Sequence, residues 1–200
     1  MAVSPTGSLF ASADEGRGLN IWDSKSLRIL FAHEGESENT TVGANPVAFS
    51  RDGKLYAYKN RIWDSAEHSE VCEIQYYEPH LCYAFSPSRD QLVLGLRPRI
   101  FDPFTGRQVL EVERFFNWAT SICYSADGTR IAASNNVNGK VHLWDSTTGI
   151  ETLVLYANGI VQQLEFANDN SMLAGACSDG SIWIWDATRK QLTSKRVALP

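Results

Sequence analysis

The stretch "VHLWDSTTG", from Val141 to Gly149, decides the fold of this chain because it recurs. Apolar residues alternate up to a tryptophan, an aspartate follows, and a polar turn comes next. Similar strings begin at residue 20 ("NIWDSKS"), residue 61 ("RIWDSAE"), residue 99 ("RIFDPFTG") and residue 183 ("WIWDATR"). The aspartates of successive copies are 38 to 43 residues apart. A period in this range indicates a repeat protein in which each copy is one supersecondary unit.

An aromatic–aspartate pair ends a predicted strand in each copy and marks the structural repeat. The pairs are Trp22–Asp23, Trp63–Asp64, Phe101–Asp102, Trp144–Asp145 and Trp185–Asp186. The residue before the aromatic is branched and apolar in every copy: Ile21, Ile62, Ile100, Leu143 and Ile184. An apolar period of two is typical of a strand with one face in the core, so we expect this column to be buried.

We expect different environments for the other two positions at the end of this strand. The aspartate is expected to accept backbone N–H groups in the turn that follows it. The residue two before the aromatic varies freely between copies, as in His142 and Trp183, and is expected to lie on a less constrained face. In the last copy, we expect Trp183 to be covered by a missing blade or by a partner chain.

An upstream turn completes the unit, with "FSRDG" from Phe49 and "YSADG" from Tyr124 as examples. The two motifs together follow the pattern "FSxDG…LxxS…DG…IxLWD", and the chain resembles the WD-repeat β-propeller family over essentially its whole length. This resemblance implies an all-β fold, a propeller of about five four-stranded blades, because stacked sheets cover one another's faces. The expected blades of this single domain, 1–200, lie at about residues 1–33, 45–77, 80–113, 118–157 and 160–200.

The chain departs from the family pattern in two respects. In the family, a histidine ahead of the innermost strand commonly joins a hydrogen-bond network with a Ser or Thr, an Asp and the Trp. The corresponding positions hold Thr40, Tyr76, Phe115 and Ala157, so we expect packing rather than this network to hold the blades together. The first copy has only "MAV" for its innermost strand, and the last copy ends with its outer strand. We therefore expect either an open, incomplete propeller, completed by self-association or by another chain, or a closed ring of five blades.

Composition and motifs limit the classes of partner, compartment and activity that are expected for this chain. The net charge of −5 argues against a nucleic-acid or membrane partner, and no apolar run approaches the ~20 residues of a membrane helix. The cysteines, Cys72, Cys82, Cys123 and Cys177, show no CxxC spacing and are expected to be reduced. That state favours a cytoplasmic location and also fits the nucleus. No phosphate loop, nucleophile elbow or metal-binding motif is present, so we expect no enzyme activity, no cofactor and no metal.

Binding is expected at the loops that lead into the innermost strands, since loops on a rigid scaffold commonly carry function. "QYYEPH" (75–80) and "ERFFNW" (113–118) concentrate aromatic side chains there, and arginines follow nearby. The candidate partner-binding residues are Tyr77, His80, Arg97, Arg99, Phe116 and Trp118. Tyr76 and Phe115 are expected to pack between blades, and packing is an equal alternative for Tyr77, Phe116 and Trp118.

The resemblance implies a non-catalytic scaffold for protein–protein interaction, with a protein partner that the sequence does not identify. Two alternatives stay open. One is a small-molecule-handling propeller enzyme, which would need clustered acids or histidines at the channel mouth. The other is a truncated propeller fragment without independent function.

Overall fold

The computed structural model describes residues 1–14, 18–34, 47–76, 82–95, 97–113, 115, 118–186 and 194–198. Over these ranges it contains twenty strands in five four-stranded antiparallel sheets, and none of these residues is assigned to a helix. The predicted all-β fold of four-stranded blades is confirmed. Each sheet is called a blade below, and its strands follow chain order across the sheet.

The strands of the five blades have the following bounds. Blade 1 holds β1 (Ala2–Val3), β2 (Leu9–Asp14), β3 (Gly18–Asp23) and β4 (Ile29–Glu34). Blade 2 holds β5 (Val47–Phe49), β6 (Leu55–Tyr58), β7 (Arg61–Asp64) and β8 (Glu70–Glu73). Blade 3 holds β9 (Tyr83–Phe85), β10 (Leu92–Leu94), β11 (Arg99–Phe101) and β12 (Gln108–Glu111). Blade 4 holds β13 (Ala119–Tyr124), β14 (Arg130–Asn135), β15 (Lys140–Asp145) and β16 (Glu151–Tyr156), and blade 5 holds β17 (Val161–Phe166), β18 (Met172–Cys177), β19 (Ser181–Asp186) and β20 (Ser194–Ala198).

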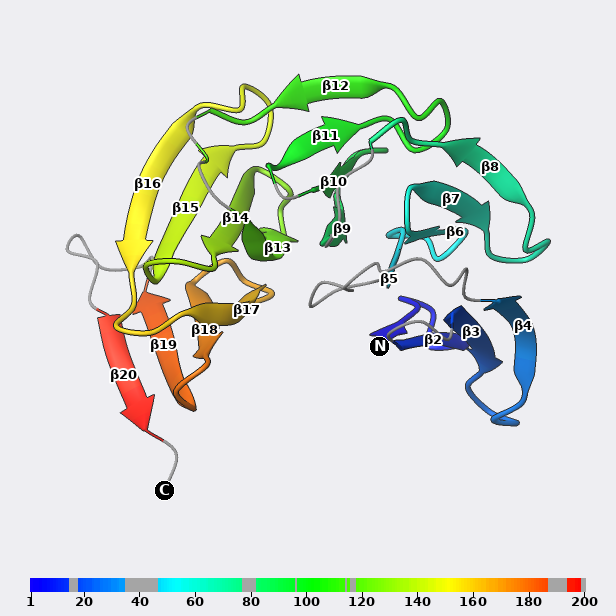
Figure 1. Cartoon of the computed structure of the whole chain (residues 1–200), viewed down its shortest axis with the longest axis horizontal. Helices are drawn as coiled ribbons and strands as arrows, with labels where there is room; N and C mark the ends of the chain where they lie inside the picture. The colour runs from blue at the N-terminus through cyan, green and yellow to red at the C-terminus, as the bar shows by residue number, and fades with distance from the viewer. Residues whose placement is uncertain are drawn as a thin grey trace.

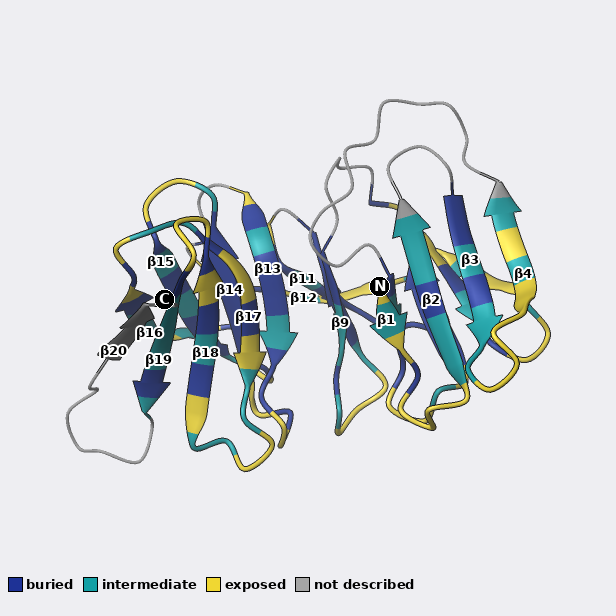
Figure 2. Ribbon diagram, turned by 90° about the horizontal axis from the view of Figure 1, so that it is seen from below, coloured by how far each residue is buried: buried dark blue, intermediate teal, exposed yellow. Residues whose placement is uncertain are grey.

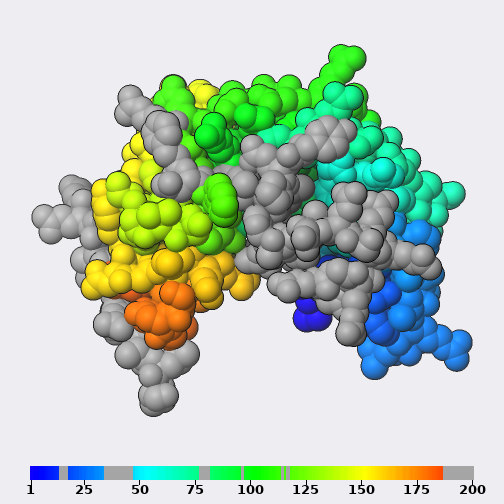
Figure 3. Space-filling model, in the orientation of Figure 1, coloured from blue at the N-terminus to red at the C-terminus, as the bar shows by residue number. Residues whose placement is uncertain are grey.

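The blades stand side by side in an arc, with β5, β9, β13 and β17 towards its centre and β4, β8, β12, β16 and β20 on its outside (Figure 1). Blade 1 and blade 5 do not meet, and open space separates them in the space-filling view (Figure 3). Of the two expected forms, the structure therefore confirms the open propeller and excludes the closed ring of five blades.

Each junction between neighbouring blades is built from two columns of the repeat. The branched residue of one blade packs in the same core cluster as the aromatic residue of the next blade. These partners are Ile21 with Trp63, Ile62 with Phe101, Ile100 with Trp144, and Leu143 with Trp185. Burial of one such side chain contributes about 1.5–3 kcal/mol, so the repeated columns account for much of the stability. The buried bands within the blades are visible in Figure 2.

The two outermost members of the columns face away from every other blade. Trp22 of blade 1 and Ile184 of blade 5 are only partly buried, whereas Ile21, Ile62, Ile100 and Leu143 are buried. Trp22 stacks on Phe10 of its own blade, with ring centroids 5.5 Å apart. The prediction of a buried branched column is thus confirmed for the four copies that have a following blade, and wrong for Ile184.

The expectation for Trp183 was wrong. Residues two apart on a strand share a face, so Trp183 lies on the same face as Trp185. That face is turned to blade 4, where Trp183 is partly buried against the shared core and stacks on Trp185 at 6.4 Å. The variable column therefore shares the aromatic face, and no missing blade is needed to cover Trp183.

In blades 1 to 4 the aspartate after the aromatic orders the next turn as predicted, while the turn after Asp186 lies outside the described residues. Asp64 Oδ1 accepts the backbone N–H groups of Ala66 and Glu67, each at 2.8 Å. Asp102 and Asp145 accept the two equivalent groups in their own turns. These hydrogen bonds favour the ionised carboxylate and lower the pKa of Asp64 and Asp145.

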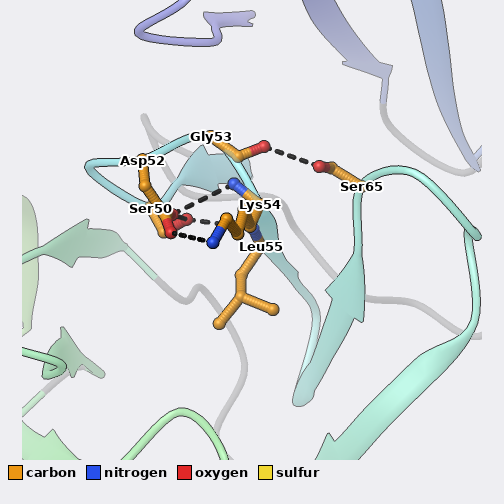
Figure 4. A network of polar contacts seen from close by, with 6 residues as sticks. All are labelled: Ser50, Asp52, Gly53, Lys54, Leu55 and Ser65. Carbon is orange, nitrogen blue, oxygen red and sulfur yellow. Dashed lines mark hydrogen bonds and ion pairs between the residues drawn. The ribbon is translucent and has the colours of Figure 1, made fainter.

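A serine after the aspartate ties two turns of the same blade together. Ser65 Oγ donates to the carbonyl of Gly53 at 2.6 Å, while Ser50 and Asp52 order the "SRDG" turn that contains this glycine (Figure 4). Ser24 and Ser146 donate to Gly7 and Gly128 in the same way, each at 2.6 Å. The sequence shows the serine in three copies but not its partner, because the two turns meet only in the folded sheet.

One hydrogen bond of the network typical of the repeat is present, although it lies within a blade and does not join two blades. In blade 1, Trp22 Nε1 donates to Ser12 Oγ on β2 at 2.8 Å. Trp144 Nε1 donates instead to the backbone carbonyl of Glu113, also at 2.8 Å, and Trp63 Nε1 is buried with no hydrogen-bond partner in the described structure. Packing is the common element of the junctions, and the polar contacts of the tryptophans differ from blade to blade.

Candidate partner-binding rim

The loops predicted to bind a partner emerge at one end of the blades. Strands alternate in direction, so the loops between successive blades leave at the same end as the loops between the second and third strands of each blade. We call this end the upper rim; it is the top edge of Figure 2. Loops at the opposite end, such as the β11–β12 turn with Phe104, form the lower rim.

Tyr76 and Phe115 fill space between blades, as predicted. Both side chains are buried, and the Tyr76 hydroxyl donates to the backbone carbonyl of Arg97 at 3.2 Å. Gly95, at a φ of +113°, leaves room for this ring, because a Cβ there would lie 2.5 Å from the Tyr76 hydroxyl oxygen. The Phe115 ring packs edge-on against Trp144, with centroids 5.6 Å apart. These two aromatics support the rim and are not available to a partner.

The described candidate residues differ in how far they are exposed to solvent. The Trp118 side chain is 54% exposed at the start of β13, and Arg97 is exposed in the loop between β10 and β11. Arg99 is partly buried, with its guanidinium 5.0 Å from the Tyr76 ring centroid and its Nε 3.5 Å from a Glu111 carboxylate oxygen. Arg99 therefore contacts Glu111 of blade 3 and Tyr76 of the connection between blades 2 and 3.

The remaining candidates, Tyr77, His80 and Phe116, lie outside the described residues. Their part in binding stays a prediction.

Val137 is a rim residue that the sequence analysis missed. It is 60% exposed at the tip of the loop between β14 and β15. The buried Asn135 holds this loop, since its Oδ1 accepts the backbone N–H groups of Val137 at 3.1 Å and Asn138 at 3.2 Å. The next residue, Asn136, donates its N–H to the Trp118 carbonyl at 3.1 Å. The only sequence signal is one apolar residue within the turn string "NNVNG".

Tyr156 is a further exposed apolar side chain at the upper end of blade 4, on the outermost strand. It is 60% exposed at the end of β16, and the Lys140 ammonium lies 5.7 Å from its ring centroid. Lys140 is opposite Tyr156 in the register of β15 and β16. We call Trp118, Val137 and Tyr156 the blade 4 rim patch.

Metal-ligating groups or membrane-spanning helices among the described residues would indicate other functions. Among these, no group of three or more His, Cys, Asp or Glu side chains is placed to hold a metal ion. Glu165 on the innermost strand β17 is exposed, and its remaining burial raises the pKa of its carboxyl group. The part of the chain that the structure covers also contains no helix with the length and hydrophobicity needed to cross a bilayer.

Comparison with known proteins gives consistent matches. The family model described as "WD domain, G-beta repeat" matches residues 112–145 and 150–186. The chain is 25% identical to autophagy-related protein 16 of Arabidopsis thaliana, over 97% of this chain and 40% of that protein. It is 24% identical to WD repeat-containing protein 82 of Drosophila melanogaster, over 92% of this chain and 49% of that protein. It is 25% identical to WD repeat and SOCS box-containing protein 1 of Danio rerio, over 96% of this chain and 50% of that protein.

The chain thus spans half or less of the length of these curated relatives. Among solved structures, a chain of "Crystal Structure of Mitotic Checkpoint Complex" superposes with a TM-score of 0.82 at 20% identity. The superposition covers 98% of this chain and 62% of that one. At this level of identity the likeness concerns the fold alone.

Proposed function

We propose that the chain is a non-catalytic protein-interaction scaffold that binds a protein partner at the blade 4 rim patch, because two WD repeats match residues 112–145 and 150–186 and the blades are arranged as in a β-propeller. The observation that carries this proposal is the exposure of Trp118, Val137 and Tyr156 on one end of one blade. Exposed aromatic side chains that can be buried by a partner dominate the energetics of protein interfaces. The basic residues Arg97 and Lys140 lie on the same rim and supply polar contacts around the patch.

Rigid support makes this patch a better binding surface than a flexible loop. Asn135 fixes the Val137 loop, and the N–H of Asn136 fixes the loop to the Trp118 backbone. Because these groups are ordered before binding, the loop of this chain loses less conformational entropy when a partner binds. The apolar side chains can therefore contribute most of their burial to affinity.

The proposal includes the cytoplasm as the compartment and a protein, not a nucleic acid or a membrane, as the partner. None of the four cysteines, all of which lie in the described residues, forms a disulfide, which supports a reducing compartment. The net charge of −5 supports a partner other than the phosphate backbone of a nucleic acid or an anionic membrane.

The test compares two side chains of equal exposure on opposite rims. A binding partner is first isolated with the wild-type chain by crosslinking, and its affinity is measured for Trp118→Ala and Phe104→Ala. Phe104 is 53% exposed on the lower rim and is thus the matched control. Trp118→Ala should weaken binding by about 30-fold, as expected for a hot spot of about 2 kcal/mol, and Phe104→Ala should leave it unchanged. Equal effects of the two variants, or a partner that contacts only the lower rim, would contradict the proposal.

A further inference from the structure

A group of aromatic and imidazole rings closes the junction between blades 1 and 2. His33 belongs to β4 of blade 1, while Tyr56 and Trp63 belong to β6 and β7 of blade 2. His33 Nε2 lies 3.1 Å from the buried Tyr56 hydroxyl, and the ring centroids of His33 and Trp63 are 4.0 Å apart. The outer strand of blade 1 is therefore attached to blade 2 through a titratable ring.

A second imidazole meets the same junction from blade 2. His68, in the turn between β7 and β8, stacks on Phe31 of β4 with ring centroids 4.8 Å apart and planes inclined by 12°. The other neighbour of the Phe31 ring is His33, at 4.7 Å. His68 Nδ1 is buried and has no hydrogen-bond partner within the described residues. The junction thus holds two imidazoles around one phenyl ring, in surroundings that provide little polar compensation for a charge.

The charged groups around the two rings make protonation unfavourable at His33. Burial, followed by the nearby His68, Lys59 and Arg61, lowers the pKa of His33 from 6.5 to about 4. Burial also lowers the pKa of His68, although the Asp64 carboxylate opposes this shift. Burial raises the pKa of the Tyr56 hydroxyl, so Tyr56 stays neutral wherever the two histidines titrate. The Tyr58 ring, 5.8 Å from His33, completes the surroundings.

We propose that the junction between blades 1 and 2 is an acid-sensitive joint, in which protonation of His33 and His68 releases the first blade from the second. In the closed junction a charged His33 would lie among aromatic rings and near the positive charges of Lys59 and Arg61, and a charged His68 would be desolvated at a cost that Asp64 only partly offsets. When the junction opens, both imidazoles reach water and can be protonated freely. Because the pKa of each histidine is lower in the closed state, the stability of the junction is complete above about pH 6.5 and is lost as the pH falls towards 4.

Hydrogen–deuterium exchange of the wild-type chain at pH 7.5 and pH 5.0, corrected for the intrinsic rate, tests the proposal blade by blade. We expect protection of β2 and β3 in blade 1 to fall roughly ten-fold at pH 5.0, after allowance for solvent screening. Protection of β14 and β15 in blade 4 should not change.

The double variant His33→Gln/His68→Asn should keep blade 1 protected at both pH values. Glutamine retains a hydrogen-bonding group for Tyr56, and asparagine tolerates the positive backbone φ of 53° at position 68. His142→Gln is the matched control in blade 4, where His142 Nδ1 lies 2.5 Å from Glu151, and it should leave the response of blade 1 intact. The proposal is overturned if blade 1 keeps its protection at pH 5.0, if all blades lose protection together, or if the double variant responds like the wild type.

A titration of the wild-type chain decides the question if the double variant does not fold. The chain has four histidines, and their ring protons can be followed by NMR as the pH is lowered. The proposal requires two of the four to titrate clearly below the ordinary value near 6.5. Four ordinary titrations would overturn it.

Discussion

Blade 4 and blade 5 have the same strands and the same repeat, but only blade 4 is covered on both faces. Leu143 of blade 4 is buried against blade 5, whereas Ile184, at the same position in blade 5, is partly exposed. On the innermost strands, Cys123 of blade 4 corresponds to Glu165 of blade 5 by the register of the two sheets. Cys123 packs into the junction core, while Glu165 is exposed.

This comparison shows that the repeat motif determines the geometry of a blade, whereas the neighbouring blade determines which of its side chains are buried. On the face turned to the preceding blade, both blades are equivalent, since Trp144 and Trp185 are both buried. On the other face, blade 5 carries a carboxylate that a following blade could cover only at a large desolvation cost. The outer face of blade 5 is thus adapted to water at the innermost strand, even though Ile184 keeps the apolar pattern of the repeat.

The largest effect is expected where the two blades are alike. Trp144→Ala and Trp185→Ala should each lower the free energy of unfolding by about 3–5 kcal/mol, because each ring is buried against the preceding blade. Urea unfolding followed by circular dichroism measures both losses. A loss under about 1 kcal/mol for either variant would show that its aromatic column is not part of a core.

The second prediction separates the two blades. Leu143→Ala should destabilise the chain by about 3 kcal/mol, since removal of the isopropyl group leaves a cavity between blades 4 and 5. Ile184→Ala should cost only about 1 kcal/mol, because part of that side chain is already in contact with water. The same unfolding measurement applies to both. Equal losses would mean that the outer face of blade 5 is covered in solution, by another copy of the chain or by another molecule.

A smaller effect is expected from the serine that joins the turns of blade 4. Ser146→Ala removes the donor to the Gly128 carbonyl and should destabilise the chain by about 1–2 kcal/mol, since the bond is buried. Blade 5 has Ala187 at the equivalent position and so lacks this hydroxyl. Thermal unfolding measures the effect, with Ser178→Ala, an exposed serine of blade 5, as the control. A neutral Ser146→Ala variant would contradict a stabilising role for the serine.

The sequence alone predicted the parts of this structure that depend on local pattern. The strand period identified the branched column, and the turn chemistry of aspartate identified the ordered turns after Trp63 and Trp144. The sequence did not predict the features that depend on which segments meet in space. The blade towards which Trp183 is turned, the Ser146–Gly128 contact and the exposure of Val137 each depend on how two turns or two blades meet in space.

The candidate site shows the same division. Tyr76 and Phe115 occupy a position that the repeat usually gives to a structural residue, so their burial could be predicted. Trp118 comes three residues after Phe115 and is 54% exposed, and no period in the sequence distinguishes the two cases. The contacts of the Arg99 guanidinium with Tyr76 and Glu111 also depend on the fold, and its part in binding stays a prediction.

The smallest expected effect concerns the carboxylate that distinguishes blade 5. Partial burial raises the pKa of Glu165, so the folded state favours the protonated carboxyl and the charged form is slightly penalised near pH 7. Glu165→Gln should therefore raise the Tm at pH 7 by about 1 °C or less and should have no effect at pH 3, where the wild-type carboxyl is protonated. Calorimetry at both pH values, with the exposed Glu67→Gln as control, measures the difference. A lower Tm for Glu165→Gln at pH 7 would show that the charge is stabilised by an interaction, and the outer face of blade 5 would then be a polar contact surface instead of a solvated one.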